Sequence, residues 1–256
     1  MGTIRKISCI VCASQAFHIK LVAGRWDIFK CGKCGLEFCS PMPTPEDLNR
    51  FYTNYSDPRA GQDVILANAH RNIKTLSDFG LTTTSRVLDF GSGQGAFVQA
   101  GNSPSWVNFD PYKEGANDET ILKSETYDWI TLWGVLEHLT DPVAQTEKLS
   151  AILMPDGYLA LTTVTTEGSI PYQHKPPEHV SYWTRRALEL LLNDSGLTIC
   201  KYAPYAMAQD CDVYLNSVLR TVPESLKPHI HHTLPKMVEV PTNEVFVICR
   251  RMRQKS

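Results

Sequence analysis

The chain alternates between short apolar runs and longer segments in which apolar residues recur at helical spacing. Each short run ends at a glycine or a polar turn, which is typical of buried strands, and the runs lie at residues 86–90, 106–109, 127–132 and 158–163. Apolar residues spaced about one helical turn apart predict a helix over residues 60–79. Residues 197–200 and 243–249 are predicted to form a closing pair of strands.

The first predicted strand leads into a turn with a glycine at every second position, VLDFGSGQG at residues 87–95. Gly91, Gly93 and Gly95 precede a helix that begins at Ala96, so backbone N–H groups lie at a helix N-terminus where a ligand can approach. Gly91, Gly93 and Ala96 also satisfy the dinucleotide pattern GxGxxA, and Asp110, at the end of the next strand, suits the ribose of either cofactor class. The turn alone leaves both classes open.

Two CxxC motifs near the N-terminus predict a metal site. Cys9 and Cys12 form the first motif, and Cys31 and Cys34 form the second. The spacing fits a zinc ribbon with four thiolate ligands, and a hairpin that turns at Ala23 and Gly24 is expected between the motifs. Four thiolates leave no position for water, so the zinc is expected to be structural rather than catalytic.

The chain divides into a zinc ribbon at residues 1–40, a connector with N-terminal helices at 41–82 and a larger domain at 83–256. Prolines stiffen the connector, and a helix is expected to begin after Thr44. Residues 203–240 are longer than a hairpin needs, which favours a substrate lid or a dimer contact over a helical surface insertion. A histidine run within them either binds a metal or is an exposed loop; it consists of His229, His231 and His232.

Composition narrows the function classes. The chain is 43% hydrophobic and 20% charged with a formal net charge of −2, whereas a protein that relies on nonspecific nucleic-acid binding is usually more basic. No apolar run approaches the roughly 18 residues of a membrane span, so no membrane partner is expected. Paired CxxC motifs without a secretion signal favour a cytoplasmic protein. Basic residues gather in residues 1–34, which either face an anionic substrate or form a solvated surface.

Two later segments distinguish between the cofactor classes. YDWITLWGVLEHLTDP at residues 127–142 and LMPDGYLALTT at 153–163, together with VLDFGSGQG, resemble the class I S-adenosylmethionine-dependent methyltransferases. The ribbon, FYTNY at residues 51–55 and PEHVSYWTRRALELLLNDSGL at 177–197 are similar to a zinc-ribbon subgroup of that superfamily. The resemblance covers nearly the whole chain.

The resemblance implies an α/β fold with a doubly wound, mostly parallel, Rossmann-like seven-stranded sheet and a small N-terminal zinc ribbon. Residues 111–126 are short for the helix and edge strand that the family places there. We therefore expect a reduced edge strand at Glu119–Leu122, with Asp118 as a candidate adenine contact.

The implied cofactors are S-adenosyl-L-methionine and structural zinc. Asp89 and the backbone of the turn would lie under the amino-acid end of the cofactor, and Asp110 would bind the ribose hydroxyls. Trp133 and Gly134 would line the pocket beside the sulfonium or the adenine, although core packing explains Trp133 equally well. The cofactor-binding candidates are Asp89, Gly91, Ser92, Gly93, Gly95, Asp110, Trp133 and Gly134.

The expected activity is in-line methyl transfer to a small molecule, with a histidine that removes the acceptor proton. His179 is the first candidate for this base, His138 the second and His174 the third. A nucleotide-linked sugar or another polysaccharide or secondary-metabolite intermediate is the leading substrate class, and the protein is expected to be a monomer or homodimer. The alternatives are an RNA methyltransferase that binds RNA through the basic ribbon, an NAD-dependent oxidoreductase, and a binding protein that keeps the fold without turnover.

Overall fold

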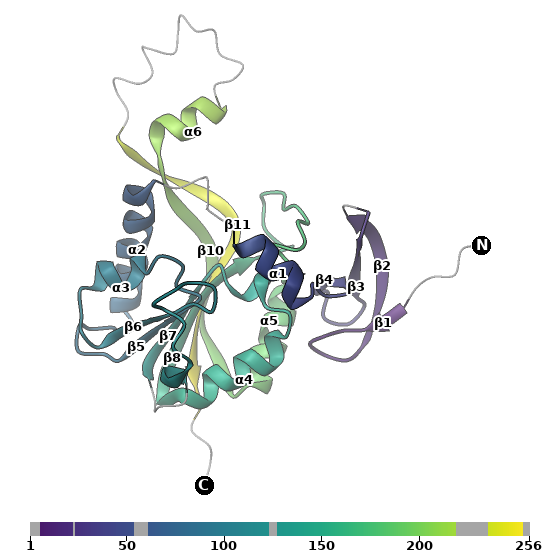
Figure 1. Cartoon of the computed structure of the whole chain (residues 1–256), viewed down its shortest axis with the longest axis horizontal. Coiled ribbons are helices and arrows are strands. Elements are labelled where there is room, and N and C mark those ends of the chain that lie inside the picture. Colours follow the sequence, from purple (N-terminus) through teal and green to yellow (C-terminus); the bar gives the residue numbers. More distant parts are fainter. Residues whose placement is uncertain (1–5, 23, 54–60, 123–126, 219–234, 253–256) are drawn as a thin grey trace, which may run out of the picture.

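The computed structural model describes residues 6–22, 24–53, 61–122, 127–218 and 235–252. The strands of these residues form two β-sheets (Figure 1). The larger sheet has the strand order β10-β11-β8-β7-β5-β6. These strands are β5 (Val87–Phe90), β6 (Trp106–Phe109), β7 (Tyr127–Trp133), β8 (Leu153–Val164), β10 (Leu197–Asp210) and β11 (Met237–Arg251). The other sheet, in the order β1-β2-β3-β4-β9, contains β1 (Lys6–Ser8), β2 (Gln15–Val22), β3 (Trp26–Cys31), β4 (Glu37–Ser40) and β9 (Ser181–Tyr182).

The larger sheet is mostly parallel, as predicted. Strand β5 pairs in parallel with β6 and β7, and β7 pairs in parallel with β8. Strand β11 pairs antiparallel with both β8 and β10, so it is the one strand of this sheet that runs against the others. Parallel strands end at the same edge of a sheet, so their loops meet there.

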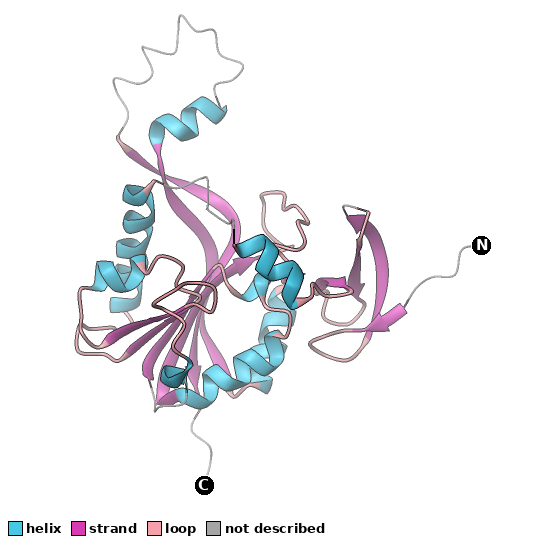
Figure 2. Cartoon of the chain, in the orientation of Figure 1, coloured by secondary structure: helices cyan, strands magenta, loops and turns pink. Residues whose placement is uncertain are grey.

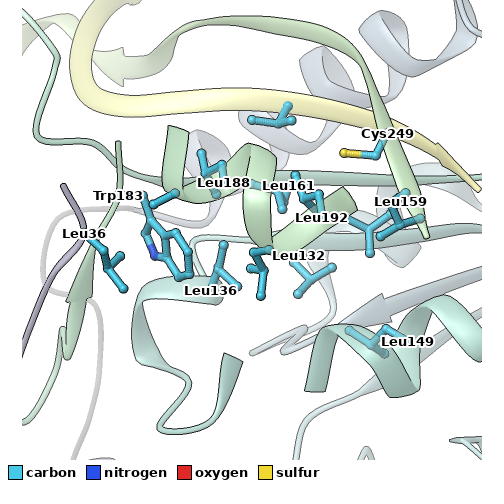
Figure 3. Close-up of a cluster of buried hydrophobic side chains, with 14 of the residues drawn as sticks. Leu36, Leu132, Leu136, Leu149, Leu159, Leu161, Trp183, Leu188, Leu192 and Cys249 are labelled. Carbon is cyan, nitrogen blue, oxygen red and sulfur yellow. The ribbon is translucent and has the colours of Figure 1, made fainter. Parts of the chain in front are cut away.

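Helices cover both faces of this sheet (Figure 2). The helices of the described residues are α1 (Pro45–Tyr52), α2 (Gln62–Ser77), α3 (Ala96–Gly101), α4 (Pro142–Ile152), α5 (Arg185–Asp194) and α6 (Cys211–Val218), with the short 3-10 helices η1 (Glu119–Leu122) and η2 (Leu136–His138). Helices α2 and α3 pack on one face through the cluster that contains Leu76 and Phe97. On the opposite face, Leu188 and Leu192 of α5 lie among strand residues such as Leu161 (Figure 3). Side chains of successive strand residues alternate between these two clusters, because a strand has a period of two.

The prediction of an edge strand at Glu119–Leu122 is wrong. The described part of the larger sheet has six strands, β6 forms its edge, and Glu119–Leu122 is the 3-10 helix η1. The chain after β6 folds back on itself instead of pairing with that strand: the N–H of Asp110 donates to the carbonyl of Ala116, and the N–H of Lys113 donates to the carbonyl of Asp110. The short segment thus satisfies its backbone groups in a local turn.

The closing strand pair is much longer than predicted. Strands β10 and β11 pair from Leu197↔Arg251 to Asp210↔Met237. The register shifts between Ile199 and Lys201 and between Pro204 and Ala206, which are irregularities of the kind that bend and twist a long strand pair. Residues 203–210 therefore belong to β10, and residues 237–240 belong to β11. Helix α6 follows β10 at the end of the strand pair that projects from the sheet (Figure 1). The histidine run at 229–232 lies outside the described residues.

The connector helix begins where the sequence predicts. Thr44 is the N-cap of α1, its side chain accepts a hydrogen bond from the N–H of Asp47, and the Asp47 carboxylate accepts from the N–H of Thr44. This reciprocal capping box, with Pro45 in the first turn, fixes the direction in which α1 leaves the ribbon. Within the described ranges, no helix has the length and apolar character that a membrane crossing requires.

Candidate active site and metal centre

The four predicted metal ligands converge in the ribbon. The sulfur atoms of Cys9, Cys12, Cys31 and Cys34 all lie within 4.8 Å of one another. Two of the sulfur pairs are separated by 3.7 Å and 3.5 Å. A tetrahedral site with Zn–S bonds of about 2.3 Å places its sulfurs roughly 3.8 Å apart, so the cluster fits zinc. A hydrogen bond from Cys34 lowers the pKa of the Cys9 thiol to about 5, which favours a thiolate in the cluster.

A cleft of about 1400 Å³ lies at the carboxyl ends of β5, β6 and β7. Its lining contains nearly all of the predicted cofactor-binding residues and both leading histidines: Asp89, Gly91, Ser92, Gly93, Asp110, Trp133, Gly134, His138 and His179. Gly95 is the exception, because it lies at the start of α3 and donates its N–H to the carbonyl of Ser92.

The glycine turn has a backbone that favours glycine. Gly91, Gly93 and Gly95 all have positive φ angles, of 72°, 55° and 74°. A Cβ on Gly91 would lie 2.5 Å from a methyl carbon of Val135, whereas a Cβ on Gly93 would have no described atom within 4 Å. The turn is therefore packed from below at Gly91 and open at Gly93, which leaves room for a ligand above the backbone.

Asp110 connects this turn to the end of β6. One carboxylate oxygen accepts a hydrogen bond from the N–H of Gly93 at 2.9 Å, and the other accepts from the N–H of Tyr112 at 2.9 Å. Each oxygen retains a lone pair for a further donor, such as a ribose hydroxyl. The loop backbone thus holds the carboxylate in one orientation within the cleft.

Asp89 is buried at the end of β5, beneath the turn. Burial raises the pKa of its carboxyl to about 7, the hydrogen bond from Thr131 at 2.7 Å opposes the shift, and the negative charge of Asp110 adds to it. A cation bound above Asp89 would favour the ionised form. Together with the orphaned hydroxyl of Ser92, which has no hydrogen-bond partner among the described residues, this donor and acceptor set fits the amino-acid end of S-adenosylmethionine.

Trp133 packs in the core and also lines the cleft. Its ring packs against Phe97 at a centroid distance of 5.2 Å and stacks on Phe246 at 6.0 Å, while the residue also lines the cleft. Gly134, with a φ of 63°, donates its N–H to Thr162. The strand end is thereby fixed between the core and the cleft.

The two leading histidines meet in the cleft. The rings of His138 and His179 are edge to face with centroids 4.8 Å apart. Nδ1 of His138 is 2.9 Å from the hydroxyl of Tyr52, and burial lowers the pKa of His138 to about 4. Nε2 of His179 lies 3.9 Å from a carboxylate oxygen of Glu178. Neutral imidazole is therefore the favoured form of His138, as a proton acceptor requires.

Glu137 joins these histidines, and sequence reasoning assigned it no role. One ligand atom each from Glu137, His138 and His179 lies within 4.8 Å of the other two, so this group is a second set that could hold a metal. Burial raises the pKa of Glu137 to about 8, with Glu244 adding to the shift, and Thr163 donates a hydrogen bond to it at 2.8 Å. A carboxyl of that pKa is mostly protonated at neutral pH, which suits a proton relay, whereas a metal ligand would have to be ionised.

Tyr52 and Tyr112 are further cleft residues whose roles the sequence did not indicate. Their rings stack with centroids 4.5 Å apart, and Tyr112 follows Asp110 by two positions. The FYTNY motif was the available signal for Tyr52. Asp118, the predicted adenine contact, does not line the cleft; its carboxylate accepts from the N–H of Thr120 and begins η1.

His174, the third candidate base, lies elsewhere. Its Nε2 is 2.9 Å from the Glu37 carboxylate, and Tyr172 donates to the same oxygen at 2.8 Å. His174 is absent from the cleft lining. Burial alone would raise the pKa of Glu37, but the hydrogen bonds from His174, Tyr172 and Lys30 lower it to about 2. His174 thus connects the larger domain to an ionised ribbon carboxylate.

Comparisons with known proteins agree with this geometry. A family model described as a methyltransferase domain matches residues 63–202, which is more than half of the chain. No curated protein matches the chain. The structure of 1,6-didemethyltoxoflavin-N1-methyltransferase from Burkholderia thailandensis, with bound 1,6-didemethyltoxoflavin and S-adenosylhomocysteine, is 15% identical, has a TM-score of 0.51, and covers 91% of this chain and 99% of that chain.

The comparison found two further solved structures. One, reported for the conversion of a disulfide bond into a thioacetal group during echinomycin biosynthesis, is 16% identical with a TM-score of 0.52 and covers 82% of this chain and 93% of that chain. A SAM-dependent methyltransferase from Aquifex aeolicus is 17% identical with a TM-score of 0.46 and covers 79% and 97% of the two chains. The family match leaves no reason to retain the NAD-dependent alternative. The chain belongs to the methyltransferase-domain family and is a class I S-adenosylmethionine-dependent methyltransferase.

Proposed function

We propose that this enzyme methylates a hydroxyl or ring nitrogen of a small molecule and that His179, beside His138, is the general base. The observation that carries the proposal is the edge-to-face pair of histidines in the same cleft as the glycine turn. The similarity in fold to the 1,6-didemethyltoxoflavin-N1-methyltransferase, which was solved with bound 1,6-didemethyltoxoflavin, supports a small-molecule acceptor.

The cofactor would bind across the carboxyl ends of β5, β6 and β7. Asp89 and the backbone of Gly91, Ser92, Gly93 and Gly95 would lie beneath its amino-acid end. Asp110 would accept from the ribose hydroxyls, and Trp133 and Gly134 would line the wall beside the sulfonium or adenine. When bound, the cofactor supplies a methyl group on a positively charged sulfur and leaves as a neutral thioether. The four ribbon cysteines would hold a structural zinc ion.

His179 would remove the proton from the acceptor as the new bond to the methyl carbon forms. The acceptor thus gains a methyl group and loses a proton, and the imidazole becomes imidazolium. Glu178, 3.9 Å from Nε2 of His179, would stabilise that positive charge. His138, held by Tyr52, would fix the face of the His179 ring that meets the acceptor.

The substrate is proposed to be anionic, with a nucleotide-linked sugar as the leading class. Lys113, Lys148 and Lys175 line the cleft. Lys113 and Lys148 are the cations that a diphosphate would meet first, because Lys175 lies 3.3 Å from a carboxylate oxygen of Glu178. The ribbon is a weaker candidate for that contact, because its Lys30 is paired with Glu37 and its Arg25 is paired with Asp47. A cytoplasmic location and a monomeric or homodimeric state stay predictions.

Calorimetric titration with S-adenosylhomocysteine tests the cofactor assignment. The wild type is expected to bind at micromolar concentration, and Asp110→Ala is expected to lose about 3 kcal/mol of binding, or roughly a hundredfold, because two charge-assisted hydrogen bonds to ribose are lost. Asp128→Ala is the matched control, since this strand carboxylate accepts a hydrogen bond from the N–H of Arg86 and does not line the cleft. Equal losses in both variants would contradict the proposed ribose contact.

Measurement of turnover tests whether His179 is the general base. Once an acceptor is found by screening, His179→Asn is expected to lower kcat by about a hundredfold or more and to leave the affinity for S-adenosylhomocysteine unchanged. Full turnover in His179→Asn together with loss in His138→Asn would transfer the role to His138. Full turnover in both variants would refute a histidine base.

A further inference from the structure

The ribbon forms a continuous sheet with the segment that carries His179. Strand β9 begins two residues after His179 and pairs with ribbon strand β4, in the register Glu37↔Tyr182 and Phe38↔Ser181. The N–H of Cys39 extends this ladder by donating to the carbonyl of Val180 at 2.9 Å. The ribbon backbone therefore fixes the chain immediately after His179.

A second connection begins at the metal site itself. The hydroxyl of Thr184 donates to the carbonyl of Cys34 at 2.6 Å and accepts from the N–H of Ala187, so it also caps α5. Gly35 packs so closely on Thr184 that a Cβ there would lie 2.9 Å from the threonine methyl carbon. A proposed zinc ligand is thus one hydrogen bond from the helix that follows β9.

Glu37 makes the third connection, through its side chain. It is buried in β4 with 4% exposure, and its two carboxylate oxygens receive Lys30 from the ribbon and both Tyr172 and His174 from the cleft loop (residues 166–180). The cleft loop contains His179 and contributes several residues to the cleft lining. Without these hydrogen bonds, the buried carboxylate would lose the three side chains that donate to it, and the loop would lose its two side-chain contacts with Glu37.

Tyr182, which lies opposite Glu37 in the ladder, closes the loop on itself. Its hydroxyl accepts from the N–H of Lys175 at 2.7 Å and donates to the carbonyl of His179 at 3.1 Å. The two ends of the histidine-bearing part of the loop are thereby tied to one side chain, and that side chain belongs to a strand that the ribbon holds.

We propose that Glu37 is a positioning residue for His179 and that the zinc ribbon, through Glu37 and the β4–β9 ladder, sets the placement of the base in the cleft. The proposal rests on the proposed function in that His179 acts on the acceptor. It gives the zinc site a role in catalysis without any contact between the metal and the substrate. A displacement of a catalytic group by about 1 Å can lower a rate by roughly a hundredfold.

The test compares two ribbon carboxylates, each of which binds a histidine. Glu37 binds His174 of the larger domain, whereas Asp27 binds His18 within the ribbon at 2.9 Å. Glu37→Ala and Asp27→Ala are made in the full-length, zinc-loaded protein. The readouts are zinc content, affinity for S-adenosylhomocysteine, the histidine NMR signal that His179→Gln removes, and kcat once an acceptor is known.

Glu37→Ala is expected to keep one zinc ion per chain and to bind S-adenosylhomocysteine within about twofold of the wild type. It is expected to shift the NMR signal of His179 and to lower kcat roughly ten- to a hundredfold. Glu37→Gln should recover most of the loss, because its amide oxygen can still accept from Tyr172 and His174. Asp27→Ala should leave the His179 signal and kcat unchanged. Tyr172→Phe is the substitute if Glu37→Ala fails to fold.

A wild-type His179 signal and wild-type kcat in folded Glu37→Ala would overturn the proposal. Equal shifts in Asp27→Ala would also overturn it, because they would reflect a general loosening of the ribbon. Failure of the wild type to bind S-adenosylhomocysteine would refute the cofactor assignment instead, while the NMR comparison would still decide whether Glu37 positions His179.

Discussion

The buried carboxyl of Asp89 makes the stability of the ligand-free enzyme depend on pH. Burial raises its pKa from 3.8 to about 7, against the opposing hydrogen bond from Thr131 and with a smaller contribution from Asp110. A group whose pKa is raised on folding contributes stability that is complete below its unfolded pKa and is lost as the pH rises through its folded pKa. Each pH unit between these values costs about 1.4 kcal/mol, so the range from pH 5 to pH 7 costs about 2 kcal/mol once the curve flattens near the folded pKa.

Asp89→Asn isolates this effect, because the amide keeps the shape of the side chain and an acceptor for Thr131 but does not titrate in this range. Urea unfolding at pH 5, 6 and 7 gives the free energy of unfolding of each protein. The wild type is expected to lose about 2 kcal/mol relative to Asp89→Asn across this range. The control Asp128→Asn should differ from the wild type by a constant amount. A constant difference for Asp89→Asn as well would refute the reasoning.

The same carboxyl couples cofactor binding to a proton. S-adenosylhomocysteine carries an ammonium group, and an ammonium above Asp89 favours the carboxylate. Below pH 7, binding is therefore expected to release up to one proton, which calorimetry in two buffers of different ionisation enthalpy measures. Proton release that persists in Asp89→Asn would assign the proton to another group.

Three further predictions concern the turn, the metal and the second buried acid. In chemical unfolding, Gly91→Ala should lose at least about 1–2 kcal/mol more stability than Gly93→Ala. Both substitutions carry the strain of a positive φ, but only Gly91 packs against Val135. Equal losses would contradict this packing. Removal of zinc with a chelator should lower the melting temperature and leave an intact far-UV spectrum for the larger sheet, and an unchanged melting temperature would argue against a metal-dependent ribbon. Raising the pH from 6 to 8 should destabilise the wild type relative to Glu137→Gln in melting experiments, because burial raises the pKa of Glu137 to about 8 and its neutral form is lost over that range; parallel melting curves would contradict the shift.

Sequence reasoning succeeded where local geometry determines the structure. The glycine turn needs positive φ at alternate positions, and each CxxC motif needs one tight turn, so the turn and each motif are signals that lie within a few residues. The same holds for the capping box at Thr44. Each of these features depends mainly on local backbone geometry, and each agrees with the structure.

Long-range partners were beyond the sequence. Nothing near Glu37 indicates that it binds Tyr172 and His174, which are far away along the chain. For the same reason the sequence ranked His174 as a candidate base, although a ribbon carboxylate holds it outside the cleft. The length of the β10–β11 pair was also missed, because its outer residues are only partly buried and lack a strong alternating pattern. Which polar group meets which carboxylate depends on the tertiary fold and not on spacing.

The dipeptide Glu137-His138 shows how burial favours the neutral forms of two adjacent titratable residues that line one cleft. Both lie in the 3-10 helix η2, in which successive side chains point about 120° apart. Burial favours the neutral form of Glu137, which accepts a hydrogen bond from Thr163, and Nδ1 of His138 lies 2.9 Å from the hydroxyl of Tyr52. Glu137 is therefore mostly uncharged and does not raise the pKa of His138, which burial lowers to about 4. A carboxylate in that position would favour imidazolium, and an imidazolium at the centre of the cleft would repel the cationic cofactor. Burial of this dipeptide thus favours neutral His138 and keeps an imidazolium charge away from the positively charged sulfur that the cofactor would bring.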